Sequence, residues 1–224
     1  MLLPTEHINI VNPGPNSGRG IYARAVAIRT REEWKNAREV ADDMCEWFDE
    51  KNGNFPGEFS RAYAIAHSQV TDDKKPLRFF VVAKELYEDK EKGKREIENF
   101  AFEARAIFNC IMLETPAKIK RRMPERRVTT DKDGKARVAV SMTEKEVPNF
   151  IDLAEGCMSF PHRKEKNVQR YFRIFVQYQY FAKFLFWQRR KTFRGWVEGL
   201  KAHIIQHEVD HFNGKNIFYE NKNA

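Results

Sequence analysis

Cysteine is scarce in this chain: its 224 residues include three, Cys45, Cys110 and Cys157, and no two of them form a CxxC pair. An odd, dispersed set argues against a disulfide framework and for a reducing compartment. Long apolar runs are also missing, since none approaches the roughly 20 residues needed to span a bilayer. The first residues show no cationic segment followed by an apolar one, so no signal peptide is evident. We therefore expect a cytoplasmic protein without a membrane partner.

Acidic residues are in the minority, with 32 Asp and Glu against 40 Lys and Arg, which gives a formal net charge of +8. A strongly basic run occupies residues 118–127, inside a segment at about 116–148 that has the pattern of an inserted arm. Asp133 and Gly134 predict a hairpin turn within this segment. Such a basic run is typical of an exposed, mobile loop, and contact with RNA or the ribosome is the alternative. We expect no DNA partner.

Two helices are predicted from apolar residues that recur at helical spacing. The first follows Thr30, whose side chain fits a capping box with Glu33, and ends at Asn52-Gly53. The second is predicted over residues 196–212.

Short apolar or alternating runs predict β-strands between these helices. The runs are 77–83, the region around 107–111, 171–180 and, as a hairpin partner of the last, 181–187. Because strands and helices do not alternate as βαβ units, the predicted fold class is α+β, with antiparallel or mixed β-sheets around the final helix. We expect a single domain over residues 1–224.

The final predicted helix contains the motif HExxH, formed by His207, Glu208 and His211. Residues i and i+4 lie on one face of a helix, so the two imidazoles can hold one metal ion and the glutamate can act on a water. Cys157, which follows Gly156, is a candidate third ligand. One Cys and two His leave one position of a tetrahedral ion open, which is typical of a hydrolase.

Two other classes of protein remain open on this pattern. A zinc endopeptidase uses the same motif but needs a further downstream ligand, and Glu220 lies beyond the Asn213-Gly214 helix stop. A non-catalytic, basic ribosome- or RNA-associated protein with a structural metal would need a fourth protein ligand.

Three segments of the chain resemble, in order, the three motifs of the peptide deformylase family. Residues 155–159 match the second motif and residues 206–211 match the third. Residues 62–69 match the first imperfectly, because Ala62 and Ala64 stand where the family has glycines and His67 stands where it has an alanine, while Gln69 matches.

The resemblance implies a metal-dependent hydrolase that removes the formyl group from N-formylmethionyl nascent peptides and releases formate. Cys157, His207 and His211 would hold the ion, with Fe(II) as the native metal and Zn, Ni or Co able to substitute. Glu208 would take the proton from the attacking water and pass it to the departing amine. Gln69 and the backbone N–H of Met158 would stabilise the oxyanion.

The resemblance also implies a substrate pocket and a supporting ion pair. The expected pocket residues are Tyr63, Ala64, Leu200, His203 and Ile204, with Arg163 or Lys164 binding the peptide backbone or carboxylate. Asp210 is expected to pair with Arg170 rather than to bind metal. The segment between the first and second motifs is longer than the family pattern. The short continuation after the third motif is similar to deformylases from phages or other divergent lineages.

Overall fold

The computed structural model describes residues 24–53, 62–71, 75–87, 102–130, 132–133, 135–159, 164–184, 187–215 and 217. Two α-helices are described, α1 (Arg31–Lys51) and α2 (Gly199–Phe212). The strands are β1 (Ala64–Ala66), β2 (Phe79–Val82), β3 (Ala106–Glu114), β4 (Lys118–Thr130), β5 (Ala136–Pro148), β6 (Phe150–Gly156), β7 (Lys164–Tyr171), β8 (Arg173–Phe184) and β9 (Trp187–Glu198). The short 3₁₀ turns are η2 (His67–Gln69) and η3 (Lys84–Leu86). Antiparallel strands with two helices confirm the α+β prediction.

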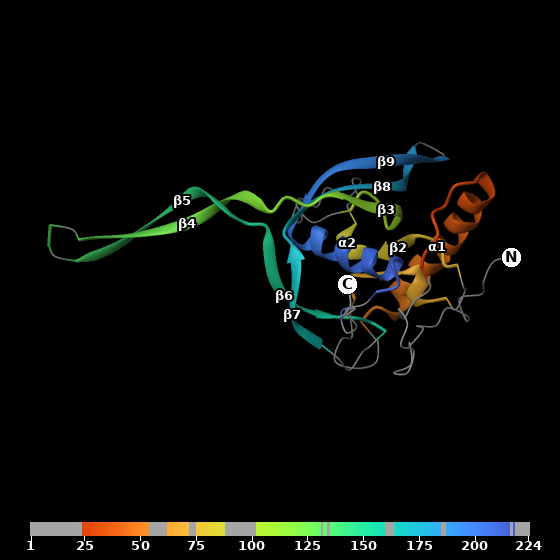
Figure 1. Ribbon diagram of the computed structural model, residues 1–224, viewed down its shortest axis with the longest axis horizontal. Coiled ribbons are helices and arrows are strands. Elements are labelled where there is room, and N and C mark those ends of the chain that lie inside the picture. The colour runs from red at the N-terminus through yellow and green to blue at the C-terminus, as the bar shows by residue number, and fades with distance from the viewer. Residues whose placement is uncertain are drawn as a thin grey trace.

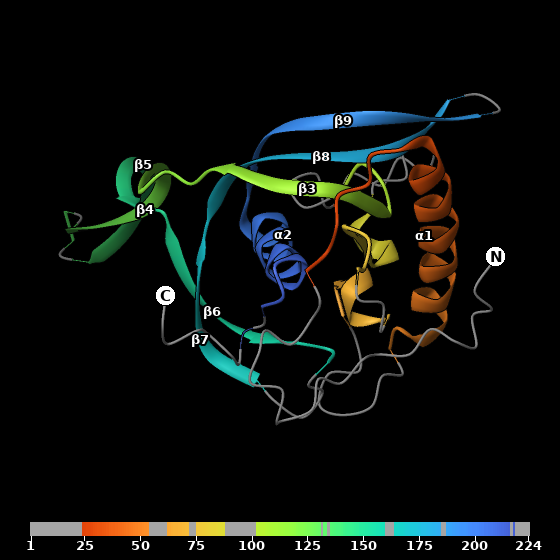
Figure 2. The same ribbon diagram turned by 45° about the vertical axis from the view of Figure 1, so that its right-hand side comes forward.

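The central element is an antiparallel five-stranded sheet in the order β1-β2-β3-β8-β9. Strand β2 is buried on both of its faces, because successive side chains point to opposite sides of a strand. Phe80 and Val82 join the core cluster of α2, whereas Phe79 and Val81 join that of α1. The two helices therefore lie against different faces of the sheet, as Figure 2 shows, and the sheet fixes the position of α2.

Helix α1 has the start and end that the sequence predicts. The Thr30 hydroxyl accepts a hydrogen bond from the Glu33 N–H, and the Glu33 carboxylate accepts one from the Thr30 N–H at 2.8 Å. The helix ends at Asn52, and Gly53 follows with a φ of 102°, a conformation that glycine adopts without steric cost.

Two predicted boundaries near the C-terminus are wrong. Residues 181–187 are not a separate partner strand, since β8 continues to Phe184 and pairs with β9 from Trp187 onward. Helix α2 begins at Gly199 rather than at residue 196, and Trp196 belongs to β9, where it opposes Phe175. Gly199 has a φ of 59°, which ends the strand and turns the chain into the helix.

Strands β4 and β5 form a long hairpin, the arm, which projects from the rest of the molecule (Figure 1). This confirms the hairpin predicted for the basic segment. Strands β6 and β7 form a second two-stranded sheet beside α2 (Figure 2). Neither described α-helix combines the length and apolar character needed to cross a membrane.

Candidate metal centre

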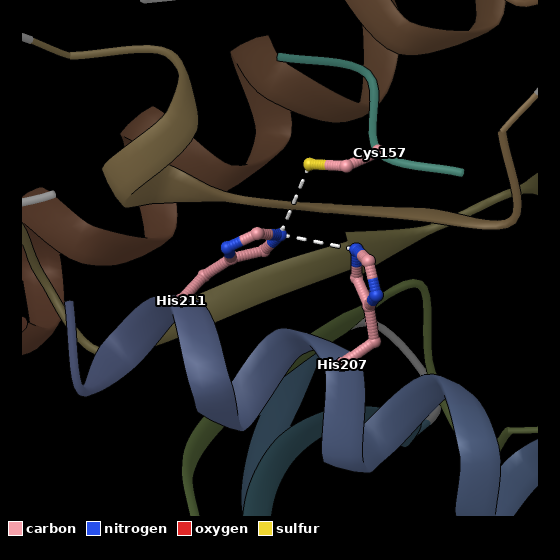
Figure 3. Close-up of side chains that lie close together, drawn as sticks. All are labelled: Cys157, His207 and His211. Atoms are coloured by element: carbon pink, nitrogen blue, oxygen red, sulfur yellow. Dashed lines mark hydrogen bonds between the residues drawn. The ribbon is translucent and has the colours of Figure 1, made fainter. Parts of the chain in front are cut away.

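Three side chains from two segments meet beside α2, as Figure 3 shows. The Nε2 atoms of His207 and His211 lie 3.1 Å apart, and the Cys157 Sγ lies 3.6 Å from His211 Nε2. All the candidate ligand atoms of this trio fall within 4.8 Å of one another. The two histidines project from successive turns of one helix face, and Cys157 follows the last residue of β6.

This cluster fits a metal ion by its donor chemistry. A thiolate sulfur and two imidazole nitrogens that converge at these distances are the ligand set of many zinc and iron sites. Glu208, beside the first histidine, has a buried Oε2 with no hydrogen-bond partner among the described residues. An unpaired buried carboxylate oxygen is costly unless a bound group or water meets it.

Glu155 connects the trio to the surrounding structure. Its Oε1 accepts hydrogen bonds from Arg170 Nε at 2.6 Å and from His203 Nε2 at 2.8 Å. Its Oε2 accepts from Arg170 Nη2 at 2.8 Å and from His207 Nδ1 at 2.9 Å. Arg170 also donates from Nη1 to Asp210 Oδ2 at 2.6 Å. The carboxylate thus fixes the ring of His207 so that its Nε2 faces the cluster.

Burial and charge shift the pKa values at the centre in opposite directions. Burial opposes ionisation of Cys157, but His211 and hydrogen bonds with both histidines hold its pKa well below the ordinary thiol value. Burial works against the charged form of His207, but hydrogen bonds with Cys157 and Glu155 raise its pKa to about 10. Burial raises the pKa of Glu208, against the effect of both histidines. The cluster therefore favours a thiolate, which is the form that binds metal.

Gln69 lies against the same cluster from the other side. Its Oε1 accepts a hydrogen bond from the Ala66 N–H at 2.8 Å, and its Nε2 lies 3.6 Å from Cys157 Sγ. The Nε2 also donates to Ser159 Oγ at 3.4 Å. Met158, the other expected oxyanion donor, is buried next to Cys157.

The alanines of the first motif lie in ordinary backbone. Asn109 is the only non-glycine residue with positive φ among the described residues, so Ala62 and Ala64 need no glycine conformation. Ala64 pairs with Val82 in β1. Residues 64–66 are therefore extended, and the chain then turns as η2 over His67–Gln69.

A cavity of about 570 Å³ opens beside the cluster. Cys157, His207 and Glu208 line it, as does Gln69. The expected pocket residues that also line it are Tyr63, Ala64, Leu200, His203 and Ile204. Arg163, the expected peptide-binding arginine, lies outside the described residues, as does the alternative third ligand Glu220.

Some of the lining residues were not expected from the sequence, among them Leu153, Glu85 and Glu155. Glu155 carried a usable signal, because it is an acidic residue two positions before a candidate ligand on a predicted strand or loop edge. A charged side chain at such a site is rarely buried without a partner. Leu153 and Glu85 carried none, since Leu153 lies in β6 and Glu85 in the turn η3, and neither belongs to a recognisable motif.

Two histidines one helical turn apart, a glutamate between them and a cysteine at a strand end define the class of metal-dependent hydrolases. The sequence pattern described as polypeptide deformylase matches residues 20–223. The chain therefore belongs to the peptide deformylase family, and it is a hydrolase that removes the formyl group from nascent peptides.

Solved structures show the same fold. The peptide deformylase from Thermotoga maritima is similar with a TM-score of 0.52 and 22% identity, over 94% of this chain and 95% of that one. The enzyme from Thermus thermophilus has a TM-score of 0.52 and 17% identity, over 95% and 83% of the two chains. A comparison with curated protein sequences finds no match.

Proposed function

We propose that Cys157, His207 and His211 hold one divalent metal ion, and that Glu208 is the general base and acid of N-formylmethionyl peptide hydrolysis. The observation that carries this proposal is the convergence of the three ligand atoms within 4.8 Å at the wall of a cavity that Glu208 also lines. A divalent ion there supplies a Lewis acid that activates water and polarises the formyl carbonyl.

Each residue of the site then has a distinct role in the reaction. The three ligands hold the ion, and Glu155 orients His207 through its Nδ1. Glu208 takes up a proton at a carboxylate oxygen and returns it to the departing amine. Gln69 Nε2 and the backbone N–H of Met158 donate hydrogen bonds to the oxyanion that forms at the formyl carbon.

The cavity wall suits a methionine side chain. Leu200 and Ile204 are apolar, and Tyr63 contributes a ring at the cavity mouth, where it is 55% exposed. A thioether packs well against such a lining. We expect peptides that begin with formylmethionine to be preferred over formyl peptides that begin with a charged residue.

The metal proposed as native is Fe(II), with Zn, Ni or Co as substitutes. A thiolate and two imidazoles suit Fe(II) and Zn alike, so ligand type does not choose between them. An Fe(II)–thiolate centre is expected to lose activity in air and to regain it after exchange with Ni or Co. Metal analysis of anaerobically purified protein tests the identity directly.

The test of the function is formate release from formyl-Met-Ala-Ser, with metal analysis of the same sample. Cys157→Ala should lose both the ion and the activity. Cys110→Ala makes the same change at a second buried thiol, outside the cluster, and should keep both. Glu208→Gln should keep the ion and lose at least ~10²-fold in kcat. A metal-free protein that releases formate at the full rate would contradict the proposal.

The alternatives are not favoured. An endopeptidase of the HExxH type has no need of a cysteine ligand, yet Cys157 lies within the cluster. A closed structural metal site needs four protein ligands, and among the described residues the cluster offers three beside a cavity.

A further inference from the structure

The arm of β4 and β5 lines no part of the catalytic cavity. It projects from the rest of the molecule (Figure 1). Its pairing runs through all 13 residues of each strand, which gives it a reach of about 40 Å at ~3.3 Å per residue. Of its strand residues, Ile119 near the base is the one that is buried. A two-stranded hairpin without a core is only marginally stable in water. A contact outside the catalytic body would account for so long an arm.

The base of the arm is fixed rather than hinged. The buried Asn149 donates from its side chain to the carbonyls of Pro116 at 2.8 Å and Arg173 at 2.7 Å. Its backbone N–H donates to Ala117 O at 3.0 Å. Arg121 lies over the Phe172 ring, 3.9 Å from its centroid. The direction of the arm is therefore set by the body of the protein.

The two faces of the arm carry similar net charges over their strand residues, +3 and +2, but they differ in how far the basic residues are paired with acidic ones. Directly opposed residues of an antiparallel pair share a face, and alternate residues follow them. One face, the basic face, carries Arg121 opposite Lys145, Arg127 opposite Ala139, and Arg137 opposite Thr129. Glu125 is the acidic residue that the described part of this face contains. Like charges directly opposite one another, as Arg121 and Lys145 are, destabilise a hairpin, and the other two arginines have no acidic residue across the ladder, so this arrangement favours an external anion.

Near the base of the arm, the two glutamates of the other face offset most of the charge of its three basic residues. Lys120 opposes Glu146 and Arg122 opposes Glu144, so these two bases have an acid across the ladder. Towards the tip the same face is mostly apolar, with the exposed residues Val128, Val138, Val140 and Met142, although Arg126 lies among them. Val128 and Val138 oppose each other directly, and such β-branched pairs stabilise the hairpin itself.

We propose that the basic face of the arm binds the phosphate backbone of RNA. Residues 118–148 hold ten Lys and Arg against five Asp and Glu, so most of the net charge of +8 belongs to the arm. Arginine is well suited to this contact because its planar fork matches two phosphate oxygens. The choice of RNA over DNA rests on the deformylase activity, since nascent peptides are made on the ribosome, which is rich in RNA.

Fluorescence anisotropy of a labelled RNA hairpin, titrated with the full chain at several salt concentrations, tests this proposal. The triple variant Arg127→Gln, Arg137→Gln, Lys145→Gln removes three charges from the basic face. It should weaken RNA binding at least about tenfold and lower the slope of log K against log salt by about 2 to 3. The matched control Lys118→Gln, Lys120→Gln, Arg122→Gln removes the same charge from the opposite face and should change both quantities less.

Two further sets of measurements distinguish a loss of RNA binding from a loss of folding, and RNA from other anionic ligands. Arg127→Lys with Arg137→Lys keeps the charge and should restore most of the affinity. Formate release from a short formyl peptide should be unchanged in every variant, so a failure here is distinct from a failure of the catalytic proposal. Equal losses in the two triple variants, no RNA binding by the unmodified chain, or tighter binding to duplex DNA or to phosphatidylserine vesicles would each overturn the inference.

Discussion

The His203 Nε2 donates to Glu155 Oε1 at 2.8 Å, so this histidine supports the metal centre indirectly rather than as a ligand. The carboxylate can only accept, which leaves the Nδ1 of a neutral His203 as an acceptor. That Nδ1 is buried and has no partner among the described residues, although the residue lines the cavity. The pocket proposed for the methionine side chain therefore has one polar wall among apolar ones.

His203→Leu should keep the metal and part of the activity. The change removes one of four hydrogen bonds on Glu155, while Arg170 and His207 still hold the carboxylate. Because the histidine acts one step away from a ligand, we expect metal affinity to fall by less than about tenfold, the lower end for outer-shell changes. Competition with a chelator measures this. Complete loss of the ion would make His203 a ligand and contradict the arrangement described here.

Glu155→Gln should destabilise the fold strongly. Glu155 and Arg170 have side-chain exposures of 2% and 9%, and removal of the Glu155 charge leaves the buried Arg170 paired with the more exposed Asp210 alone among the described residues. We expect the free energy of unfolding to fall by about 3–5 kcal/mol. The matched control is Asp49→Asn, which breaks a bidentate pair with Arg105 whose exposures are 37% and 17% and should cost about 0–1 kcal/mol. Urea unfolding of metal-free protein measures both, and similar losses would refute the reasoning.

Gln69→Glu should lower kcat by about 10²–10³-fold, the usual effect of losing one oxyanion donor. The new carboxylate can still accept from the Ala66 N–H, but it no longer presents the amide N–H that lies 3.6 Å from Cys157 Sγ. Metal content should stay near that of the unmodified chain. A variant with normal kcat would remove Gln69 from the catalytic set.

The free energy of unfolding should fall at alkaline pH because of a buried thiol outside the Cys157–His207–His211 cluster. Burial raises the pKa of Cys110 from 9.0 to about 12. The unfolded chain then loses this proton from about pH 9 upward while the folded chain retains it. The free energy of unfolding should decline between pH 9 and 12 with a slope of up to about 1.4 kcal/mol per pH unit from this group. Cys110→Ala should flatten the decline, and an unchanged slope in that variant would contradict the assignment.

The sequence predicts much of the site because several of its residues are close together along the chain. His207, Glu208 and His211 lie within one helical turn, so their common face follows from helix geometry alone. The Thr30–Glu33 capping box is local for the same reason. The start of α2 was misplaced because helical spacing continues into residues that pair as β9, and pairing with β8 outweighs that spacing.

The connections through Glu155 could not be derived in this way. They need β6 and β7 to bring Glu155 and Arg170 together and α2 to bring His203 to the same place. Such contacts depend on strand register, which a single sequence does not specify. The continuous pairing of β4 and β5 also could not be predicted from the sequence, since a basic run and a turn signal are compatible with an irregular loop as well.

The two ends of the arm lie close together at its base, which determines how the arm can be removed from the chain. The Asn149 backbone nitrogen lies 3.0 Å from the carbonyl oxygen of Ala117, so the two ends of the arm adjoin. A gene encoding the chain without residues 118–148 would need only a short linker to rejoin them. Adjoining chain ends of this kind are typical of surface positions at which insertions and deletions are tolerated.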